Sequence, residues 1–352
     1  MFLKEKQDLV KKFIMNKECP SPGIFFEITR KCNLKCRHCR VVEINKKMEL
    51  SYREICNIID QLAEIGCFYI DFTGGEPLMR RDFFNIAIYT RRKKMTFIIH
   101  TNGSLITSSI ADRIADLHPL EIYIPFLGLR EETDDRLRGR RGIHKKVIRA
   151  VKLLEERGVR TRLTLVVMKQ NATEMIKAKE FVQKIGGSSW YFLPLIHPRI
   201  DGSESPLICR ASDSQLEQIG RFIPEWRIDT TSFVSSSDFL DYPVCTAGKQ
   251  ASIITAYGEF NPCFWFPDKN NTRNLREKTL FQIWKSDPKF KKLASLKNKD
   301  LPICKNCNLR IYCNPCPALS FFEKRNITLP SSEICRTARI RKGIFEKGGK
   351  NE

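Results

Sequence analysis

Apolar and polar positions alternate in blocks along residues 23–195. Apolar runs rich in β-branched residues predict six strands, at 23–29, 69–73, 96–101, 121–127, 160–167 and 188–195. Helix-period segments lie between them, at 51–66, 81–94, 106–117, 144–158 and 172–186. Ser51 with Glu54 three residues later forms a capping-box pattern at the start of the first of these helices.

Strands that alternate with helices predict a parallel sheet with right-handed crossovers. Six strands are fewer than the eight of a closed barrel, so the α/β pattern fits either an open, partial barrel or a doubly wound sheet. In both folds ligands bind where the strands end. We expect this domain at 23–210, after an N-terminal helix and linker at 1–22 and before a bridging region at 211–244 with a helix near 212–222. A cysteine-rich module at 245–340 and a basic tail at 341–352 follow.

The chain is strongly basic. It has 61 Lys and Arg against 40 Asp and Glu, a net charge of +21, with local clusters at 91–94 and 136–141. Such a surface attracts nucleic acid, acidic peptides or membrane head groups, unless it reflects a lysine-rich composition with no specific partner. No apolar run is long enough to span a bilayer, and the N-terminus lacks a secretion signal. We therefore expect a cytoplasmic protein.

Fourteen cysteines point to metal or redox chemistry, since cytosolic chains keep few disulfides. Three of them, Cys32, Cys36 and Cys39, follow directly on the first predicted strand. Structural zinc sites need a fourth ligand, and His38 is poorly placed to bind the same metal as Cys39. Three cysteines on a four-iron cluster would leave one iron open to another ligand. The alternatives are a zinc knuckle or cysteines with no ligand role.

The Cys-x3-Cys-x2-Cys spacing after the first strand of a βα array resembles the radical S-adenosylmethionine (SAM) enzymes. Thr-Gly-Gly-Glu-Pro at 73–77 and Thr-Asn-Gly at 101–103 follow the next two strands, in the family's order. The resemblance covers residues 23–195 and implies a partial (β/α)6 TIM-like barrel with a SAM-binding [4Fe-4S] cluster on the three cysteines. It also implies a set of SAM contacts, namely Gly74, Gly75, Glu76, Thr101, Asn102 and His38.

The fourth predicted strand departs from the family pattern. Family members often carry Ser or Thr there just before a Gly, whereas this chain has Pro125, which offers neither a hydroxyl nor an N–H donor. Arg138, from the next segment, is expected to reach the SAM carboxylate, because guanidinium groups pair bidentately with carboxylates. The neighbouring Arg136, Arg140 and Arg141 are expected at the surface or facing substrate.

The seven later cysteines allow a double zinc site or a disulfide knot by number alone, and the cytosolic setting disfavours the knot. Beside a radical SAM domain their spacing resembles a SPASM domain, which binds one or two auxiliary [4Fe-4S] clusters. The resemblance assigns one cluster to Cys304, Cys307, Cys313 and Cys335. It assigns the other to Cys245, Cys263 and Cys316, with an open iron or with Asp238 or Asp241 as an oxygen ligand.

The resemblance implies a 5′-deoxyadenosyl radical that takes hydrogen from a substrate. SPASM enzymes mostly modify peptides or proteins, and a separate leader-binding protein is expected together with an electron donor such as flavodoxin or ferredoxin. The alternative is a small molecule or sugar in cofactor or secondary-metabolite biosynthesis. A zinc-containing nucleic-acid binder ranks last, because aromatic and basic residues do not interleave as in a stacking platform. No membrane partner is expected.

Overall fold

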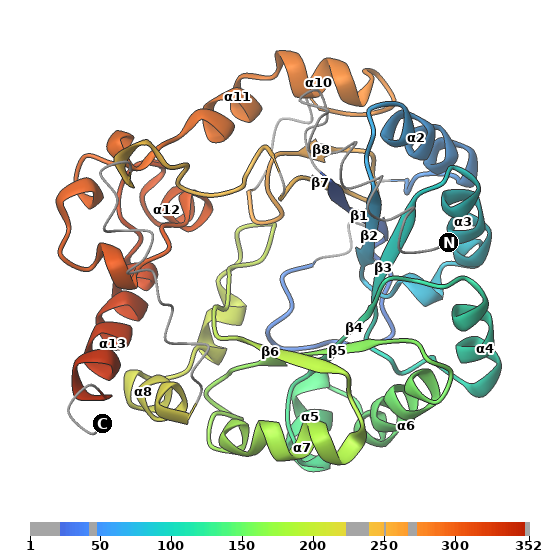
Figure 1. Ribbon diagram of the computed structural model, residues 1–352, viewed down its shortest axis with the longest axis horizontal. Helices are drawn as coiled ribbons and strands as arrows, with labels where there is room; N and C mark the ends of the chain where they lie inside the picture. The colour runs from blue at the N-terminus through green and yellow to red at the C-terminus, as the bar shows by residue number, and fades with distance from the viewer. Residues whose placement is uncertain (1–21, 42–47, 223–238, 250, 267–272, 349–352) are drawn as a thin grey trace.

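One eight-stranded sheet curves around the molecule to form an open barrel (Figure 1). The computed structural model describes residues 22–41, 48–222, 239–249, 251–266 and 273–348, so the predicted N-terminal helix lies outside it. The sheet order is β6-β5-β4-β3-β2-β1-β7-β8, and β1 to β6 are parallel. The strands are β1 (Gly23–Thr29), β2 (Tyr69–Gly74), β3 (Thr96–His100), β4 (Ile122–Phe126), β5 (Thr161–Val166), β6 (Ser189–Leu193), β7 (Ile253–Ile254) and β8 (Phe260–Asn261).

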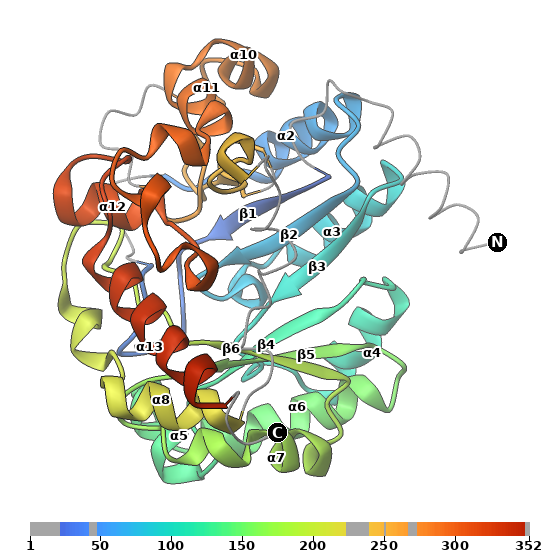
Figure 2. The same ribbon diagram turned by 60° about the vertical axis from the view of Figure 1, so that its left-hand side comes forward.

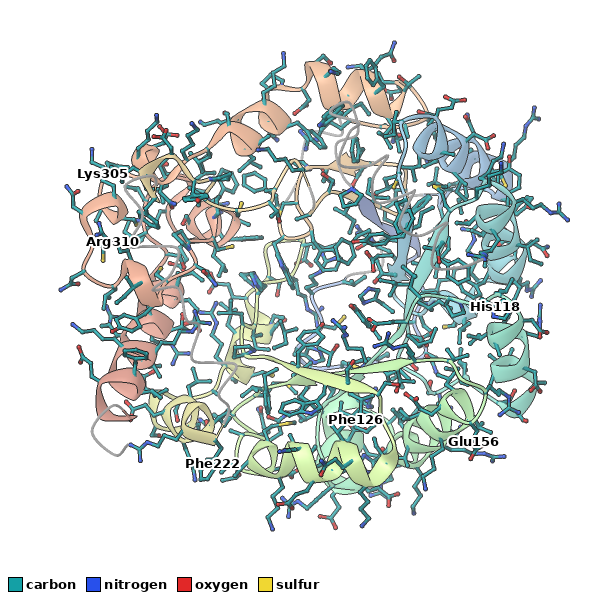
Figure 3. The ribbon with its side chains drawn as sticks, in the orientation of Figure 1. His118, Phe126, Glu156, Phe222, Lys305 and Arg310 are labelled. Carbon is teal, nitrogen blue, oxygen red and sulfur yellow. The ribbon has the colours of Figure 1, made fainter. Side chains whose placement is uncertain are left out.

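Helices cover the outer face of this sheet. Successive strand side chains point to opposite faces, and the outward set, such as Phe26, Phe72 and Phe97, is fully buried beneath the helices. Phe126 of β4 packs at 5.2 Å from the ring of Phe181 in this layer (Figure 3). The helices are α2 (Tyr52–Glu64), α3 (Phe83–Arg92), α4 (Ser108–Asp116), α5 (Glu131–Arg138), α6 (Ile143–Glu155), α7 (Ala178–Ile185) and α8 (Asp213–Phe222).

The six predicted strands and the capping box of α2 are confirmed. Ser51 Oγ accepts from the Glu54 N–H, while the Glu54 carboxylate accepts from the Ser51 N–H. The predicted helix at 172–186 is in part a 3-10 turn, η2 (Glu174–Lys177), before α7. The sequence pattern missed α5, because its eight residues, Glu131–Arg138, include a single large apolar side chain and have no helical apolar period.

The C-terminal region completes the open side of the barrel. β7 pairs in parallel with β1, and β8 returns antiparallel through a turn at Gly258, whose φ of +87° suits glycine. These two strands were not predicted from the sequence. The region also contains α10 (Leu280–Ser286), α11 (Pro288–Ser295), α12 (Pro317–Lys324) and α13 (Ser332–Gly348). α13 continues past the boundary that the sequence analysis placed at 340.

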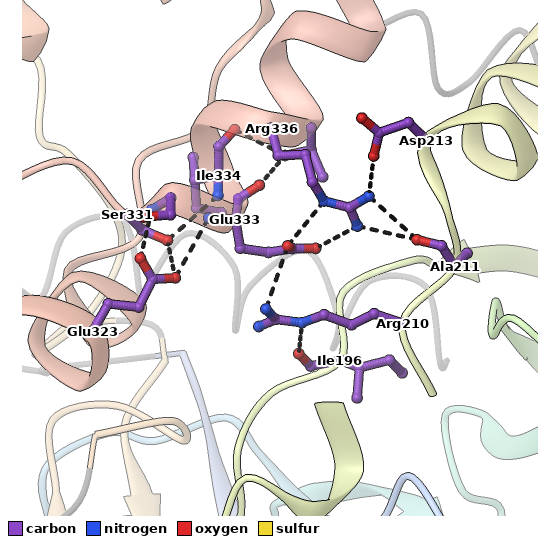
Figure 4. A network of polar contacts seen from close by, with 11 residues as sticks. Ile196, Arg210, Ala211, Asp213, Glu323, Ser331, Glu333, Ile334 and Arg336 are labelled. Atoms are coloured by element: carbon purple, nitrogen blue, oxygen red, sulfur yellow. Dashed lines mark hydrogen bonds and ion pairs between the residues drawn. The ribbon is translucent and has the colours of Figure 1, made fainter. Parts of the chain in front are cut away.

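Both ends of this region are fixed to the barrel. At one end, Glu54 of α2 pairs with Arg276 at 2.5 Å, and α10 lies over α2 (Figure 2). At the other end, Arg336 of α13 pairs both with Glu333 on its own helix and with Asp213 of α8 (Figure 4). The 223–238 part of the bridging region lies outside the described residues. Among the described helices, none combines the length and apolar character that a bilayer crossing requires.

Candidate active site

The loop after β1 brings Cys32, Cys36 and Cys39 together. The Cys39 N–H donates to the Cys36 carbonyl at 3.1 Å, which folds the loop back on itself. Burial raises the pKa of the Cys36 thiol to about 12; Arg138 opposes this shift, and Cys39 and Cys32 add to it. The three thiols therefore lie on one folded loop and act electrostatically on one another, and binding of a cluster would have to remove their protons.

Two glycines let the loop after β2 lie directly against the cysteine loop. The Gly75 N–H donates to the Thr29 carbonyl at 2.9 Å, and the Glu76 N–H donates to the Lys31 carbonyl at 2.8 Å. A Cβ on Gly74 would lie 2.0 Å from the Thr29 carbonyl oxygen, and one on Gly75 would lie 2.3 Å from that of Lys31. Only glycine fits at these two positions, which explains the Gly-Gly pair physically.

Glu76 connects this loop to the loop after β3. Its buried carboxylate accepts from the Thr101 hydroxyl and the Asn102 N–H, both at 2.7 Å, and from the Leu78 N–H at 3.1 Å. Burial raises the pKa of Glu76, although these hydrogen bonds oppose the shift. Asn102 Nδ2 in turn lies 4.0 Å from the Cys32 sulfur. The structure thus gathers the predicted SAM-contact residues of three strand ends around the first cysteine.

The Glu76→Gln variant should be less stable than the wild type by about 1–3 kcal/mol. The amide cannot accept from both the Thr101 hydroxyl and the Asn102 N–H, so one buried donor loses its partner. Anaerobic urea unfolding would measure the difference. The exposed Glu132→Gln on α5 is the matched control, and an equal, small effect of both substitutions would contradict this role of Glu76.

Arg138 forms a buried ion pair with Asp134 and is not free to turn toward a cofactor with its whole guanidinium group. Its side chain is 1% exposed, donates from Nε to Asp134 at 2.7 Å, and also donates to the Pro125 carbonyl. Burial would raise the pKa of Asp134, but Arg138 lowers it overall. The ion pair fixes α5 to the end of β4, because Asp134 also accepts from the Leu127 N–H. A contact of Arg138 with SAM stays a prediction, and two of its donors are already used.

His38 is half-buried within the cysteine loop, directly before Cys39. Burial and the nearby Arg138 lower its pKa to about 4, so the imidazole is neutral. Its Nδ1 has no hydrogen-bond partner among the described residues. An unpartnered buried nitrogen beside the cysteines fits the predicted role of His38 as a cofactor contact, which remains a prediction.

Four C-terminal cysteines line one cavity of about 280 Å³. Burial raises the pKa of the Cys313 thiol to about 12, and the nearby Cys335 and Cys304 add to the shift. The cavity walls are otherwise largely apolar, with Leu301 and Leu309 among them. Its cysteines are those that the resemblance groups into one auxiliary cluster, namely Cys304, Cys307, Cys313 and Cys335.

The other auxiliary group, Cys245, Cys263 and Cys316, also comes together. Burial raises the pKa of Cys263 to about 12, and Cys316 and Cys245 add to the shift. Asp241, one of the two predicted oxygen ligands, binds Lys299 at 2.8 Å and Lys297 at 3.1 Å instead of standing free. The other, Asp238, lies outside the described residues. In the described part of the chain, no three His, Cys, Asp or Glu groups are arranged to hold a single metal ion.

Arg40 joins the two parts of the site and was missed by the sequence analysis. It follows Cys39, and its guanidinium lies 3.3 Å from the ring centroid of Phe264, which follows Cys263. Its Nη2 also pairs with Glu27 of β1 at 3.2 Å. Burial lowers the pKa of Arg40 to about 10. The loop of the first cysteines and the loop of Cys263 are therefore in direct contact.

The inner face of the barrel carries a second set of residues that motif reasoning missed. His100 Nε2 lies 3.0 Å from Asp71, and the His100 ring packs edge-on against Tyr123 with centroids 4.6 Å apart. Tyr191 of β6 is 39% exposed, and Phe25 of β1 is half-buried. A closed barrel has a packed interior, whereas His100, Tyr123, Tyr191 and Phe25 are partly exposed and Asp71 is buried. Along β4 the burial alternates between Ile122, Ile124 and Phe126, which are buried, and Tyr123 and Pro125, which are half-buried, and this alternation is the signal that marks Tyr123.

A partial barrel with three cysteines at its first strand end, closed by a module with seven more, defines an iron–sulfur enzyme of the radical SAM type. Residues 26–182 match the family model of the radical SAM superfamily, and residues 245–308 match that of an iron–sulfur cluster-binding domain, the SPASM domain. The chain belongs to the radical SAM superfamily and carries a C-terminal SPASM domain. These domains bind SAM and [4Fe-4S] clusters, which the gathered thiols fit.

Curated relatives act on different kinds of molecule. The chain is 36% identical over 156 residues to Fe-coproporphyrin III synthase of Methanosarcina barkeri, with 44% of this chain and 39% of that protein covered. It is 25% identical to AdoMet-dependent heme synthase of the same organism, over 85% of this chain and 91% of that protein. It is also 25% identical to PqqA peptide cyclase of Granulibacter bethesdensis, over 83% of this chain and 80% of that protein.

Among solved structures, Streptococcus suis SuiB bound to its precursor peptide SuiA has the same fold. The TM-score is 0.72 at 20% identity, and the match covers 95% of this chain and 80% of SuiB. The expected partial barrel with its C-terminal cysteine-rich module is thus confirmed.

Proposed function

We propose that this enzyme removes a hydrogen atom from a peptide or protein substrate that enters the barrel. The bound [4Fe-4S] cluster and SAM supply a 5′-deoxyadenosyl radical for that step. Cys32, Cys36 and Cys39 hold the cluster beside the loops that carry Glu76 and Thr101. The chain's own contribution is to bind, orient and shield the reacting groups.

The accessible inner face of the barrel carries this proposal. Its rings extend from Phe25 on β1 through Tyr123 on β4 to Tyr191 on β6, and Tyr123 and Tyr191 have centroids 6.3 Å apart. Aromatic side chains with polar tips bind both the apolar and the polar parts of a peptide. The Asp71–His100 pair offers a hydrogen-bonding group next to the cofactor loop that begins at Thr101.

Peptide cyclisation by one relative and the peptide complex of SuiB support this substrate class. The basic chain suits an acidic leader segment, since complementary charge speeds encounter. We also propose a separate leader-binding protein, and the cytosol as location, where thiols stay reduced.

The test is hydrogen transfer from labelled substrate. Deuterated candidate peptides, encoded next to the gene for this chain, are incubated with the anaerobic holoenzyme and SAM. We expect deuterium in 5′-deoxyadenosine and a peptide mass changed by the reaction. Absence of transfer from every such peptide would contradict the peptide proposal.

The variants His100→Ala and Asp71→Asn separate substrate handling from cofactor handling. Asp71 holds the half-buried His100 at 3.0 Å, and neither side chain forms a hydrogen bond with the cysteine loop among the described residues. We therefore expect iron content and SAM cleavage to persist while peptide product falls on the order of tenfold or more. His100→Gln retains hydrogen bonding and should recover part of the product. If His100→Ala and Asp71→Asn both form product at the wild-type level, these residues take no part in substrate binding.

A tetrapyrrole is the second candidate substrate. It is favoured by the 36% identity with Fe-coproporphyrin III synthase and by the alignment with a heme synthase over 85% of this chain. The same assay with labelled coproporphyrin decides between the two classes. Deuterium transfer or mass loss from the tetrapyrrole, without transfer from peptides, would replace the peptide proposal.

A further inference from the structure

Exposed basic side chains lie on the first cysteine loop and on the segment in contact with it. Two of them flank Cys36 within the loop, and the others come from the end of α5 and the segment that follows it. All belong to the exposed class of residues. We call this set the loop patch, and its members are Lys35, Arg37, Arg136, Arg140 and Arg141.

Backbone contacts make these two segments one surface. The Lys35 N–H donates to the Arg138 carbonyl at 3.3 Å, and the Arg37 N–H donates to the Leu137 carbonyl at 3.1 Å. Gly139 allows the close approach, because its φ is +72° and a Cβ there would lie 3.2 Å from the Lys35 carbonyl oxygen. Positive charges that are about 100 residues apart in sequence therefore lie around the same loop.

The charges of the loop patch have no ion-pair partner among the described residues, unlike their neighbours. Arg130 at the start of α5 pairs with Glu174 at 2.8 Å, and Lys145 pairs with Glu131 at 3.0 Å. Asp135 is buried and accepts from the N–H groups of Ile143 and His144 at the start of α6.

Part of the loop patch lines a hollow. Arg136, Arg140 and Arg141 border a depression of about 600 Å³, together with Glu131 and Glu132. Asp135 also lines the hollow, but its buried carboxylate accepts backbone N–H groups, and Glu131 pairs with Lys145. The exposed charges without an ion-pair partner among the described residues are therefore three arginines against Glu132. Unpaired cations around a concave surface are typical of a docking site for an acidic partner.

The position of the loop patch distinguishes an electron donor from a substrate. Lys35 and Arg37 are adjacent to Cys36 in the chain, so a protein on this surface comes within a few residues of the first cluster. The substrate-facing residues, such as His100 and Tyr123, lie instead on the inner face of the barrel. A donor that docks on the loop patch would reach the cluster without entering the inner face proposed for the substrate.

We propose that the loop patch is the docking surface for an acidic electron-carrier protein of the flavodoxin or ferredoxin class. The donor is oxidised by one electron, and the cluster on Cys32, Cys36 and Cys39 is reduced by one, with no atom transferred. The proposal rests on the radical SAM class of the enzyme but not on its substrate. Its test therefore uses SAM cleavage without any substrate.

The triple variant R136Q/R140Q/R141Q tests the proposal in the anaerobic holoenzyme. With reduced flavodoxin as donor, we expect the apparent KM for flavodoxin to rise on the order of tenfold, because steering by a charged surface has effects of at least this size. With dithionite, a small reductant that needs no docking surface, we expect the rate of SAM cleavage to be unchanged. Calorimetric titration of flavodoxin should show weaker binding, with a flatter dependence on salt.

The second basic cluster provides a matched control. R91Q/R92Q/K94Q removes the same number of charges at the end of α3, which leads into the start of β3, whereas the cysteine loop lies where the strands end. We expect this variant to keep the wild-type KM for flavodoxin. An equal rise in KM for both variants, or no rise for the first, would overturn the proposal.

Two further results would also count against it. A matching fall in dithionite-driven cleavage would show that the substitutions damage the cluster site instead of docking. Weaker binding of an acidic leader peptide, with unchanged flavodoxin KM, would show that the loop patch serves substrate capture.

Discussion

Replacement of Cys32, Cys36 and Cys39 together by alanine should abolish reductive cleavage of SAM while leaving auxiliary iron bound. The three thiols lie on one loop, and the SPASM cysteines form separate groups, so the loss should be confined to about four irons per chain. Anaerobic iron analysis and quantification of 5′-deoxyadenosine with dithionite as reductant measure both effects.

The matched control removes three cysteines outside both sets, Cys56, Cys67 and Cys209. Cys67 and Cys209 are buried and Cys56 lies half-buried on α2, as expected of packing residues. Their replacement by alanine should leave iron content and SAM cleavage near the wild-type values. If cleavage persists in the Cys32/Cys36/Cys39 variant, the proposed mechanism is wrong.

Anaerobically reconstituted wild-type protein should contain roughly eight to twelve irons per chain, since two or three four-iron clusters would form. Replacement of the four cavity cysteines, Cys304, Cys307, Cys313 and Cys335, by alanine should remove about four of these irons, because they line one shared cavity. Iron and sulfide analysis measure the loss, and SAM cleavage should remain detectable.

Replacement of Cys263 and Cys316 tests the other auxiliary group in the same way. Loss of about four further irons would indicate a second auxiliary cluster, despite its incomplete cysteine set. An iron content near four in the wild type would contradict both auxiliary assignments.

The sequence predicted the barrel well because apolar runs rich in β-branched residues come in turn with helix-period segments along 23–195. β1 is such a run, and its residues Ile24, Phe26 and Ile28 are all buried, so the apolar content was enough to locate the strand. α5 was not predicted from the sequence, because a buried ion pair between Asp134 and Arg138 stabilises it instead of an apolar stripe. β7 and β8 were not predicted, because strands of two residues are too short to show a pattern of apolar and polar positions.

The candidate site was predicted where residues are adjacent in motifs and missed where the fold assembles them. Spacing indicated the cysteines and Glu76, and the structure adds that Glu76 bonds to Thr101 and Asn102. No spacing rule links Arg40 to Phe264, since a contact across more than two hundred residues depends on how β7 joins β1. The sequence likewise assigned Arg138 by its chemistry, without the information that Asp134 already binds it.

The pairing of β1 with β7 has a consequence for synthesis on the ribosome. β1 is made early, yet β7, its partner on one side, lies more than two hundred residues later in the chain. Arg336, which ties α13 to Asp213 on α8, is made later still. Domains emerge from the N-terminal side first, so the nascent barrel has an unpaired edge at β1, the kind of edge that promotes misassociation. Most of the polypeptide must therefore be translated before that edge is covered.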